Sequence, residues 1–131
     1  MPDVLPSFTK GYMVQYACRS AINSQVVAFK RDFFFDSAGP FLCPILDIPM
    51  GVEDSDVHHL PPNDFHVLVH RWLEARGRTY EDIELNEPVR IRTARFADPM
   101  ERADWADFHQ ANAKLVVISR TAHRLLGRSA A

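Results

Sequence analysis

Residues 98–126 read DPMERADWADFHQANAKLVVISRTAHRLL, and this stretch weighs most in predicting the fold. Its first four residues, Asp98-Pro99-Met100-Glu101, are typical of a helix start. Apolar residues then recur at intervals of three and four, the spacing of a helix that buries one narrow face against another helix. This seam consists of Phe108, Ala111, Leu115, Ile118, Ala122 and Leu125. We therefore predict one long C-terminal helix that serves packing and carries no catalytic group.

The composition of the chain is that of a globular protein. Its 131 residues are 47% hydrophobic and 24% charged, enough to form a core, so we predict a single domain over residues 1–131. The net charge of −2 argues against a general binder of polyanions. Apolar runs fall short of the ~20 residues that cross a bilayer, and a secretory signal is missing. Cys18 and Cys43 are too few for a disulfide framework or a zinc site, and we expect two buried, reduced thiols rather than a bridge.

The N-terminal part of the chain has no acidic residue between Val4 and Arg31, although it is rich in basic and hydroxyl side chains. This composition resembles a mitochondrial targeting segment. A plain amphipathic core helix explains the same segment, because its apolar residues fall roughly on one helical side. They are Phe8, Tyr12, Cys18, Ile22, Val26 and Phe29. The predicted location is therefore mitochondrial or, failing that, cytoplasmic.

The middle of the chain, residues 39–63, holds five of the nine prolines. Prolines at this density exclude a continuous helix and favour extended chain. Apolar anchors lie within it at Phe41-Leu42-Cys43 and Ile45-Leu46. Such a segment is most easily stabilised by lying on another surface. We expect Glu53, Asp54 and Asp56 to form a solvated loop.

A second amphipathic helix is predicted next, from a cap at Asn63 or Asp64 to about Arg76, with Gly77 as its stop. Its expected buried side consists of Phe65, Leu68, Val69, Trp72 and Leu73. Thr79-Tyr80-Glu81-Asp82 indicates a further short helical turn, and Val89-Arg90-Ile91-Arg92 alternates like a strand edge. The predicted fold is mostly α, with two or three amphipathic helices, the long C-terminal helix and a proline-rich extended middle. The alternative is α+β with a short hairpin.

Histidines are the candidate metal ligands. His66 and His70 are four residues apart on the second predicted helix and share a face, and His58 and His59 lie upstream. A metal site needs three or four converging ligands, so hydrogen-bonded histidines explain the pattern at least as well. We expect His109 and His123 to lie on the surface. Neither cysteine belongs to a nucleophile motif, and a glycine-rich phosphate loop is missing. The sequence therefore predicts a protein that is not an enzyme and holds no cofactor.

Six arginines between Arg71 and Arg95 are interrupted by five acidic residues, which leaves this region almost neutral. Nucleic-acid surfaces need unopposed basic residues. The pattern favours a salt-bridged surface or a protein interface instead of a nucleic-acid site. Arg90, Arg92 and Arg95 could also face anionic lipid headgroups.

One family resemblance arises at the centre of the chain. The run Asp56-Val57-His58-His59-Leu60-Pro61-Pro62, followed by Arg71 and Ala75, resembles the core segment of the small 14-kDa subunit of the mitochondrial cytochrome bc1 complex. The resemblance covers residues 56–75. It implies a mostly helical, non-catalytic subunit without haem, peripheral to the inner membrane on the matrix side and in contact with the membrane-embedded cytochrome subunit.

The residues and the resemblance agree on a non-catalytic accessory subunit of a larger assembly, with other protein subunits as partners. The resemblance implies that this assembly is a mitochondrial respiratory complex. Three consecutive phenylalanines, Phe33-Phe34-Phe35, cannot all enter one core, so at least one is expected to meet a partner or lipid. The predicted interface anchors are Phe108, Leu115, Ile118, Leu125, Trp72 and Phe34. The alternatives are an autonomous binding or inhibitor protein and a metal-dependent enzyme using His66, His70 and an upstream ligand such as His58.

Overall fold

The computed structural model describes residues 7–36, 38–87 and 90–130, and within them the fold is mostly α, as predicted. The chain divides into two compact units. The first comprises Met1–Asn23 and Pro62–Ala113, and the second Ser24–Pro61 and Lys114–Ala131. The expectation of a single domain over residues 1–131 stays a prediction. Within the described part of the chain, no helix is both long and apolar enough to cross a membrane.

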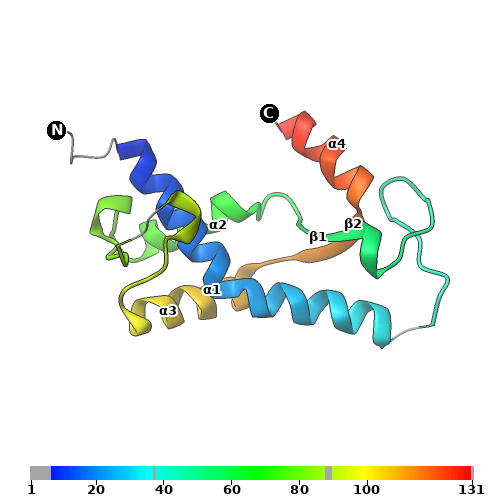
Figure 1. Cartoon of the computed structure of the whole chain (residues 1–131), viewed down its shortest axis with the longest axis horizontal. Coiled ribbons are helices and arrows are strands. Elements are labelled where there is room, and N and C mark those ends of the chain that lie inside the picture. Colours follow the sequence, from blue (N-terminus) through cyan, green and yellow to red (C-terminus); the bar gives the residue numbers. More distant parts are fainter. Residues whose placement is uncertain (1–6, 37, 88–89, 131) are drawn as a thin grey trace. The chain divides into compact units, whose positions relative to one another are not determined.

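The predicted N-terminal helix is present as α1, Ser7–Phe35, whose residues are shared between the two units (Figure 1). In the first unit its buried stripe follows the helical period and consists of Met13, Val14, Ala17, Cys18 and Ile22. Tyr12 and Phe29, which are predicted on the buried side, are exposed. In the first unit the neighbours of Tyr12, Met13 and Val14, form the buried stripe instead. The side chain of Phe8 lies outside the described residues.

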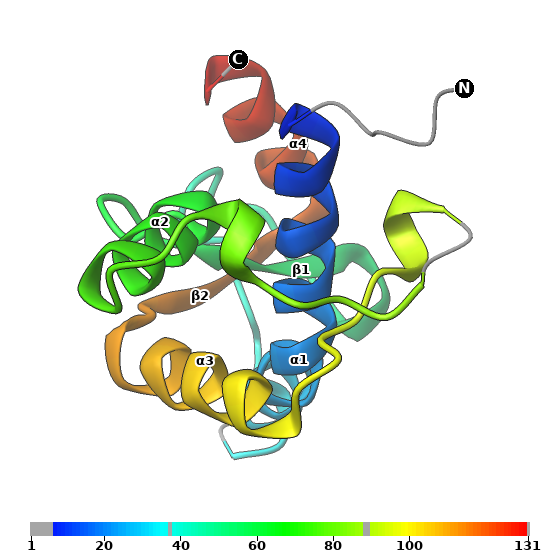
Figure 2. The ribbon, with the colours of Figure 1, turned by 90° about the vertical axis from the view of Figure 1, so that its left-hand side faces the viewer.

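The first unit contains α2, Phe65–Ala75, and α3, Pro99–Asn112, which Figure 2 shows to one side of the first part of α1. The five residues predicted to be buried on α2 are all buried. Asp64 occupies the N-cap position, although its side chain makes no capping bond. The helix stops where Gly77 adopts φ +65°, a left-handed conformation that glycine takes without strain. The predicted turn after Thr79 is a short 3₁₀ helix, Tyr80–Asp82.

Trp105 lies at the centre of the core of the first unit. Its indole Nε1 donates a hydrogen bond to the backbone oxygen of Cys18, 3.0 Å away, which ties α3 to α1. Its ring packs edge-on against Phe65 and tilted against Trp72, with ring centroids 5.9 and 5.5 Å away. His109, one turn further along α3, is also fully buried. The expectation that His109 lies on the surface is therefore wrong.

The second unit contains a two-stranded antiparallel sheet. Strand β1, Ser55–His59, pairs with β2, Leu115–Ser119, so that Val57 lies opposite Val117 (Figure 1). The helix α4, Arg120–Ala130, follows β2 directly. The core of this unit is small and consists of Cys43, Met50, Val117, Ile118 and Ala122. Both cysteines of the chain are free and buried, as predicted.

Three predictions about local structure are wrong. The long C-terminal helix is divided into α3, β2 and α4, since Val116, Val117 and Ile118 are β-branched residues that pair with β1. Ile91 and Arg92 belong to a 3₁₀ turn, Ile91–Thr93, instead of a strand edge, and Val89 lies outside the described residues. The expected acidic loop is exposed at Glu53 and Asp54, as predicted, but it forms a 3₁₀ turn, Val52–Asp54, and Asp56 belongs to β1.

Candidate functional site

Apolar side chains are exposed along the proline loop of the second unit, residues 39–52. Leu42, Ile45, Ile48 and Val52 keep 47%, 48%, 39% and 51% of their surface accessible. Covering a side chain of this kind completely contributes about 1.5–3 kcal/mol of favourable transfer free energy. Their concentration in one short segment distinguishes it from the scattered apolar residues that any protein surface carries. The loop is therefore the candidate interaction site of the second unit.

The proline loop is held in shape by its own backbone. The N–H of Cys43 donates to Ile48 O at 2.8 Å, that of Asp47 to Cys43 O at 2.8 Å, and that of Met50 to Phe41 O at 3.0 Å. Cys43 and Met50 enter the core, so the loop is anchored on one side while its other apolar side chains remain accessible. An ordered loop loses less conformational entropy on binding than a mobile one.

Cys43 attaches the loop to β2. Its sulfur accepts a hydrogen bond from the backbone N–H of Ser119 at 3.3 Å. Burial alone would raise the pKa of this thiol, but hydrogen bonds from the side chain and backbone of Ser119 and from the backbone of Leu46 and Ile45 lower it to about 7. The side chain is 1% exposed, so its role in the fold is to anchor the loop. Sequence reasoning could not find this role, because it depends on residues 76 positions apart.

The residues predicted as interface anchors differ in how deeply they are buried. Trp72 and Ile118 are buried inside their own units, so they are core residues and not surface anchors. Phe108 and Leu115 are half-buried, and Leu125 is exposed. In the phenylalanine run, Phe33 and Phe34 pack against Phe41, with centroids 5.3 and 4.9 Å away, and Phe35 is 79% exposed. The expectation that the three cannot all enter one core is confirmed, and the exposed residue is Phe35. Contact of one of them with a partner or lipid stays a prediction.

The candidate metal ligands fall in different units. His66 and His70 lie on α2 in the first unit, and His58 lies on β1 in the second. The Nε2 atom of His70 forms a hydrogen bond with the hydroxyl of Tyr80 at 3.0 Å, and the ring of His58 lies edge-on to His123 at 5.6 Å. Among the residues that the structure describes, no three His, Cys, Asp or Glu side chains form a metal-binding group. Hydrogen-bonded side chains account for the positions of His70 and His123.

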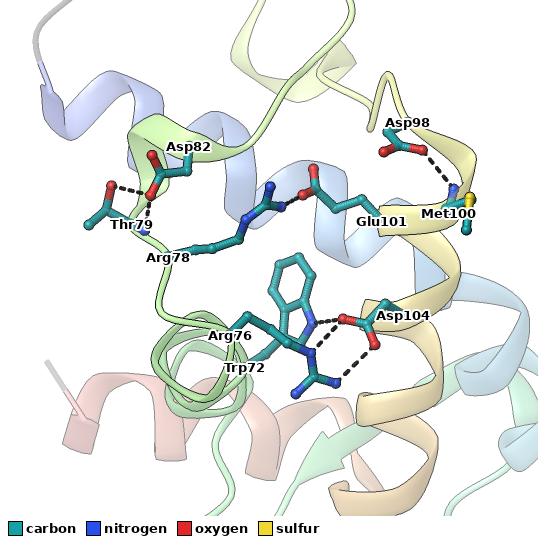
Figure 3. Close-up of polar contacts among 9 residues, drawn as sticks. All are labelled: Trp72, Arg76, Arg78, Thr79, Asp82, Asp98, Met100, Glu101 and Asp104. Atoms are coloured by element: carbon teal, nitrogen blue, oxygen red, sulfur yellow. Dashed lines mark hydrogen bonds and ion pairs between the residues drawn. The ribbon is translucent and has the colours of Figure 1, made fainter.

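The first unit contains a polar site between the end of α2 and the start of α3 (Figure 3). The carboxylate of Asp104 accepts three hydrogen bonds, from Trp72 Nε1 at 2.9 Å, Arg76 Nε at 2.8 Å and Arg76 Nη2 at 2.9 Å. Arg78 forms an ion pair with Glu101. These side chains line a groove of about 360 Å³.

The end of α2 and the start of α3 position these polar side chains. Arg76 occupies the C-cap of α2, and Gly77 turns the chain so that Arg78 follows outside the helix. At α3, the carboxylate of Asp98 accepts a bond from the backbone N–H of Met100 at 2.9 Å and thereby caps the helix. Glu101 and Asp104 are three residues apart and share a face of α3.

The electrostatics of the groove indicate a structural clamp. The hydrogen bonds from Arg76 and then from Trp72 hold the pKa of Asp104 below its ordinary value. The bond to Asp104 in turn raises the pKa of Arg76. A carboxylate that stays ionised and already accepts three hydrogen bonds is a poor general base. We interpret the cluster as a connection between α2 and α3.

The arginine-rich region also forms contacts within the chain. Arg71 donates to Asn63 Oδ1 at 2.6 Å, and Arg95 donates to the backbone oxygens of Arg92 and Ala94 at 3.1 and 2.8 Å. The ion pairs of Arg76 with Asp104 and of Arg78 with Glu101 fit the predicted salt-bridged surface. The bonds of Arg71 and Arg95 instead go to neutral oxygens. No known protein family, curated protein or solved structure matches this chain.

Proposed function

We propose that this protein is a non-catalytic subunit that binds a partner protein through the proline loop of its second unit. The observation that carries the proposal is the exposure of Leu42, Ile45, Ile48 and Val52 on one ordered segment. Phe35 adds a large aromatic side chain close in sequence to this segment. Aromatic and aliphatic side chains that enter a partner's pockets commonly dominate binding energy at protein interfaces.

The shape of the loop supports binding to a preformed groove. Prolines restrict the unbound backbone, and the internal hydrogen bonds fix the turn, so little ordering remains to be done on association. The loop is also anchored through buried Cys43 and Met50, so its exposed side chains are attached to a packed core. The resemblance of residues 56–75 to the bc1 subunit makes a mitochondrial respiratory complex the first assembly to examine.

Site-specific photocrosslinking in the cells that make the protein tests this proposal. A photoreactive amino acid placed at Leu42 or at Ile45 is expected to link the chain to one protein species, identified by mass spectrometry. The same group at exposed Thr121 on α4 is the control and should not give that product. The linked protein should also copurify with the unmodified chain in a fixed stoichiometry.

Two results would contradict the proposal. One is the absence of a specific product from both loop positions while the chain remains folded by circular dichroism. The other is a product containing only two copies of this chain, which would indicate self-association. The double variant Leu42→Ser with Ile45→Ser is expected to remove binding. It should lower the free energy of unfolding by about 1.5–3 kcal/mol, because about half of each side chain is covered in the free chain, so circular dichroism must verify that the variant remains folded.

A further inference from the structure

The first unit contains a pocket of about 470 Å³ that belongs neither to the proline loop nor to the groove around Asp104. It is lined by α1, by His66 of α2 and by Tyr80 of the following turn. Its volume falls within the roughly 300–1,000 Å³ of small-molecule sites. Three tyrosines, Tyr12, Tyr16 and Tyr80, give the pocket its aromatic walls.

One wall of the pocket is fixed in position. The hydroxyl of Tyr80 accepts a hydrogen bond from Gln15 Nε2 at 2.9 Å and forms another with His70 Nε2 at 3.0 Å. The ring of Tyr80 lies close to Gly11, where a Cβ atom would be 3.4 Å from the ring. A Cβ at that distance makes ordinary van der Waals contact, so the ring packs against this part of α1. A wall fixed in this way is suited to bind a planar ligand without rearrangement.

The pocket also contains a cation. The guanidinium carbon of Arg19 lies over the Phe65 ring, 4.3 Å from its centroid, in a cation–π contact. Among the described residues, no carboxylate forms an ion pair with Arg19, and none of those lining the pocket is acidic. Burial lowers the pKa of Arg19, which remains positively charged at neutral pH.

We propose that this pocket binds a small aromatic carboxylic acid. The guanidinium of Arg19 presents two parallel N–H donors, which match the two oxygens of one carboxylate. The faces and edges of Tyr12, Tyr16 and Tyr80 offer stacking and edge-to-face contacts to an aromatic ring. A single arginine neutralises one negative charge, so a monocarboxylate fits the site better than a doubly charged phosphate ester.

Isothermal titration calorimetry on the intact chain at pH 7 tests the proposal, with benzoate, 4-hydroxyphenylacetate and indole-3-acetate as probes. At least one acid is expected to bind with one site per chain and a dissociation constant below about 1 mM. The matching amides, benzamide, 4-hydroxyphenylacetamide and indole-3-acetamide, keep the ring but lose the charge. The amide of the acid that binds is expected to bind at least roughly tenfold more weakly.

Substitutions then assign the binding to Arg19. Arg19→Gln should weaken the acid roughly tenfold or more, and Arg19→Lys should weaken it less. Arg31→Gln is the matched control, since it removes an exposed arginine of the same helix that pairs with Asp32 in the second unit, and it should leave binding unchanged. Circular dichroism of each variant verifies folding.

The proposal is overturned if none of the three acids gives saturable binding at concentrations up to about 10 mM. It is also overturned if acid and amide bind equally well, because the charge would then play no part. This comparison uses the unmodified chain, so it remains decisive even if Arg19→Gln fails to fold. Equal binding of acid to folded Arg19→Gln would likewise refute the role of Arg19.

Discussion

Two aromatic residues of α3 show how strongly single side chains determine the packing of the first unit. Trp105 and His109 are four residues apart, and both are fully buried against Phe65. The sequence interpretation instead placed Phe108 and Ala111 on the packed face, and Ala111 is exposed. The hydrogen bond from Trp105 to the backbone of Cys18 fixes which face of α3 turns inward. That partner is 87 residues away in the chain, so local periodicity could not reveal it.

Burial of His109 makes the stability of the protein depend on pH. Loss of solvent lowers the pKa of His109 to about 4, whereas an unfolded histidine titrates near ~6.5. Between these values the unfolded chain binds a proton that the folded chain does not bind. The free energy of unfolding is therefore expected to fall as the pH is lowered through this window, by at most about 1.4 kcal/mol per pH unit from this residue.

Urea unfolding at pH 7 and pH 4.5 measures this effect. His109→Leu should show a smaller loss of stability between the two pH values than the parent chain. Gln110→Leu, which introduces the same side chain at an exposed position of α3, should retain the parental loss. If His109→Leu and the parent lose the same free energy of unfolding on acidification, the histidine is not responsible.

At the level of secondary structure, the C-terminal third shows the limit of pattern reading. A three-four spacing from Phe108 to Leu125 predicts a helix, but Ala113 adopts an extended conformation and ends α3. The side-chain amide of Asn112 donates to Phe108 O at 2.8 Å at this helix end. The next residues pair with β1, which lies about 60 residues earlier in the chain. Glycine and proline, which would have signalled the break, are both missing between 100 and 126.

Two glycines with different backbone conformations test the interpretation of the helix ends. Gly77 has φ +65°, so Gly77→Ala should reduce the free energy of unfolding by about 1 kcal/mol through backbone strain. Gly127 lies within α4 with open space around it, so Gly127→Ala should raise that free energy by up to about 1 kcal/mol. Urea titrations followed by circular dichroism measure both changes. A shift of both variants in the same direction would contradict this assignment.

At the scale of the molecule, the two units have separate cores, and tryptophan fluorescence reports on the first unit alone. Both tryptophans, Trp72 and Trp105, belong to the first unit. Ile118 belongs to the core of the second unit and is fully buried. An unpaired carboxylate at that position would lose its hydration without gaining a partner.

Ile118→Asp is therefore expected to destabilise the second unit by several kcal/mol, on the order of 3 or more. The loss of far-UV ellipticity should then begin at a lower urea concentration than the change in tryptophan fluorescence. Leu125→Asp, at an exposed position of α4, should leave the two transitions as they are in the parent chain. Coincident transitions in Ile118→Asp, both shifted to lower urea, would show that the units unfold together.

The sequence by itself determined the elements whose signals are local. The buried face of α2, its stop at Gly77, the helical turn after Thr79 and the exclusion of an α-helix from the proline loop all follow from side-chain period, glycine conformation and proline geometry. Tertiary structure decided the pairing of β1 with β2, the burial of His109, the attachment of Cys43 to β2 and the pocket around Arg19. Each of these depends on contacts between residues far apart in the chain, whose energies do not appear in any local pattern.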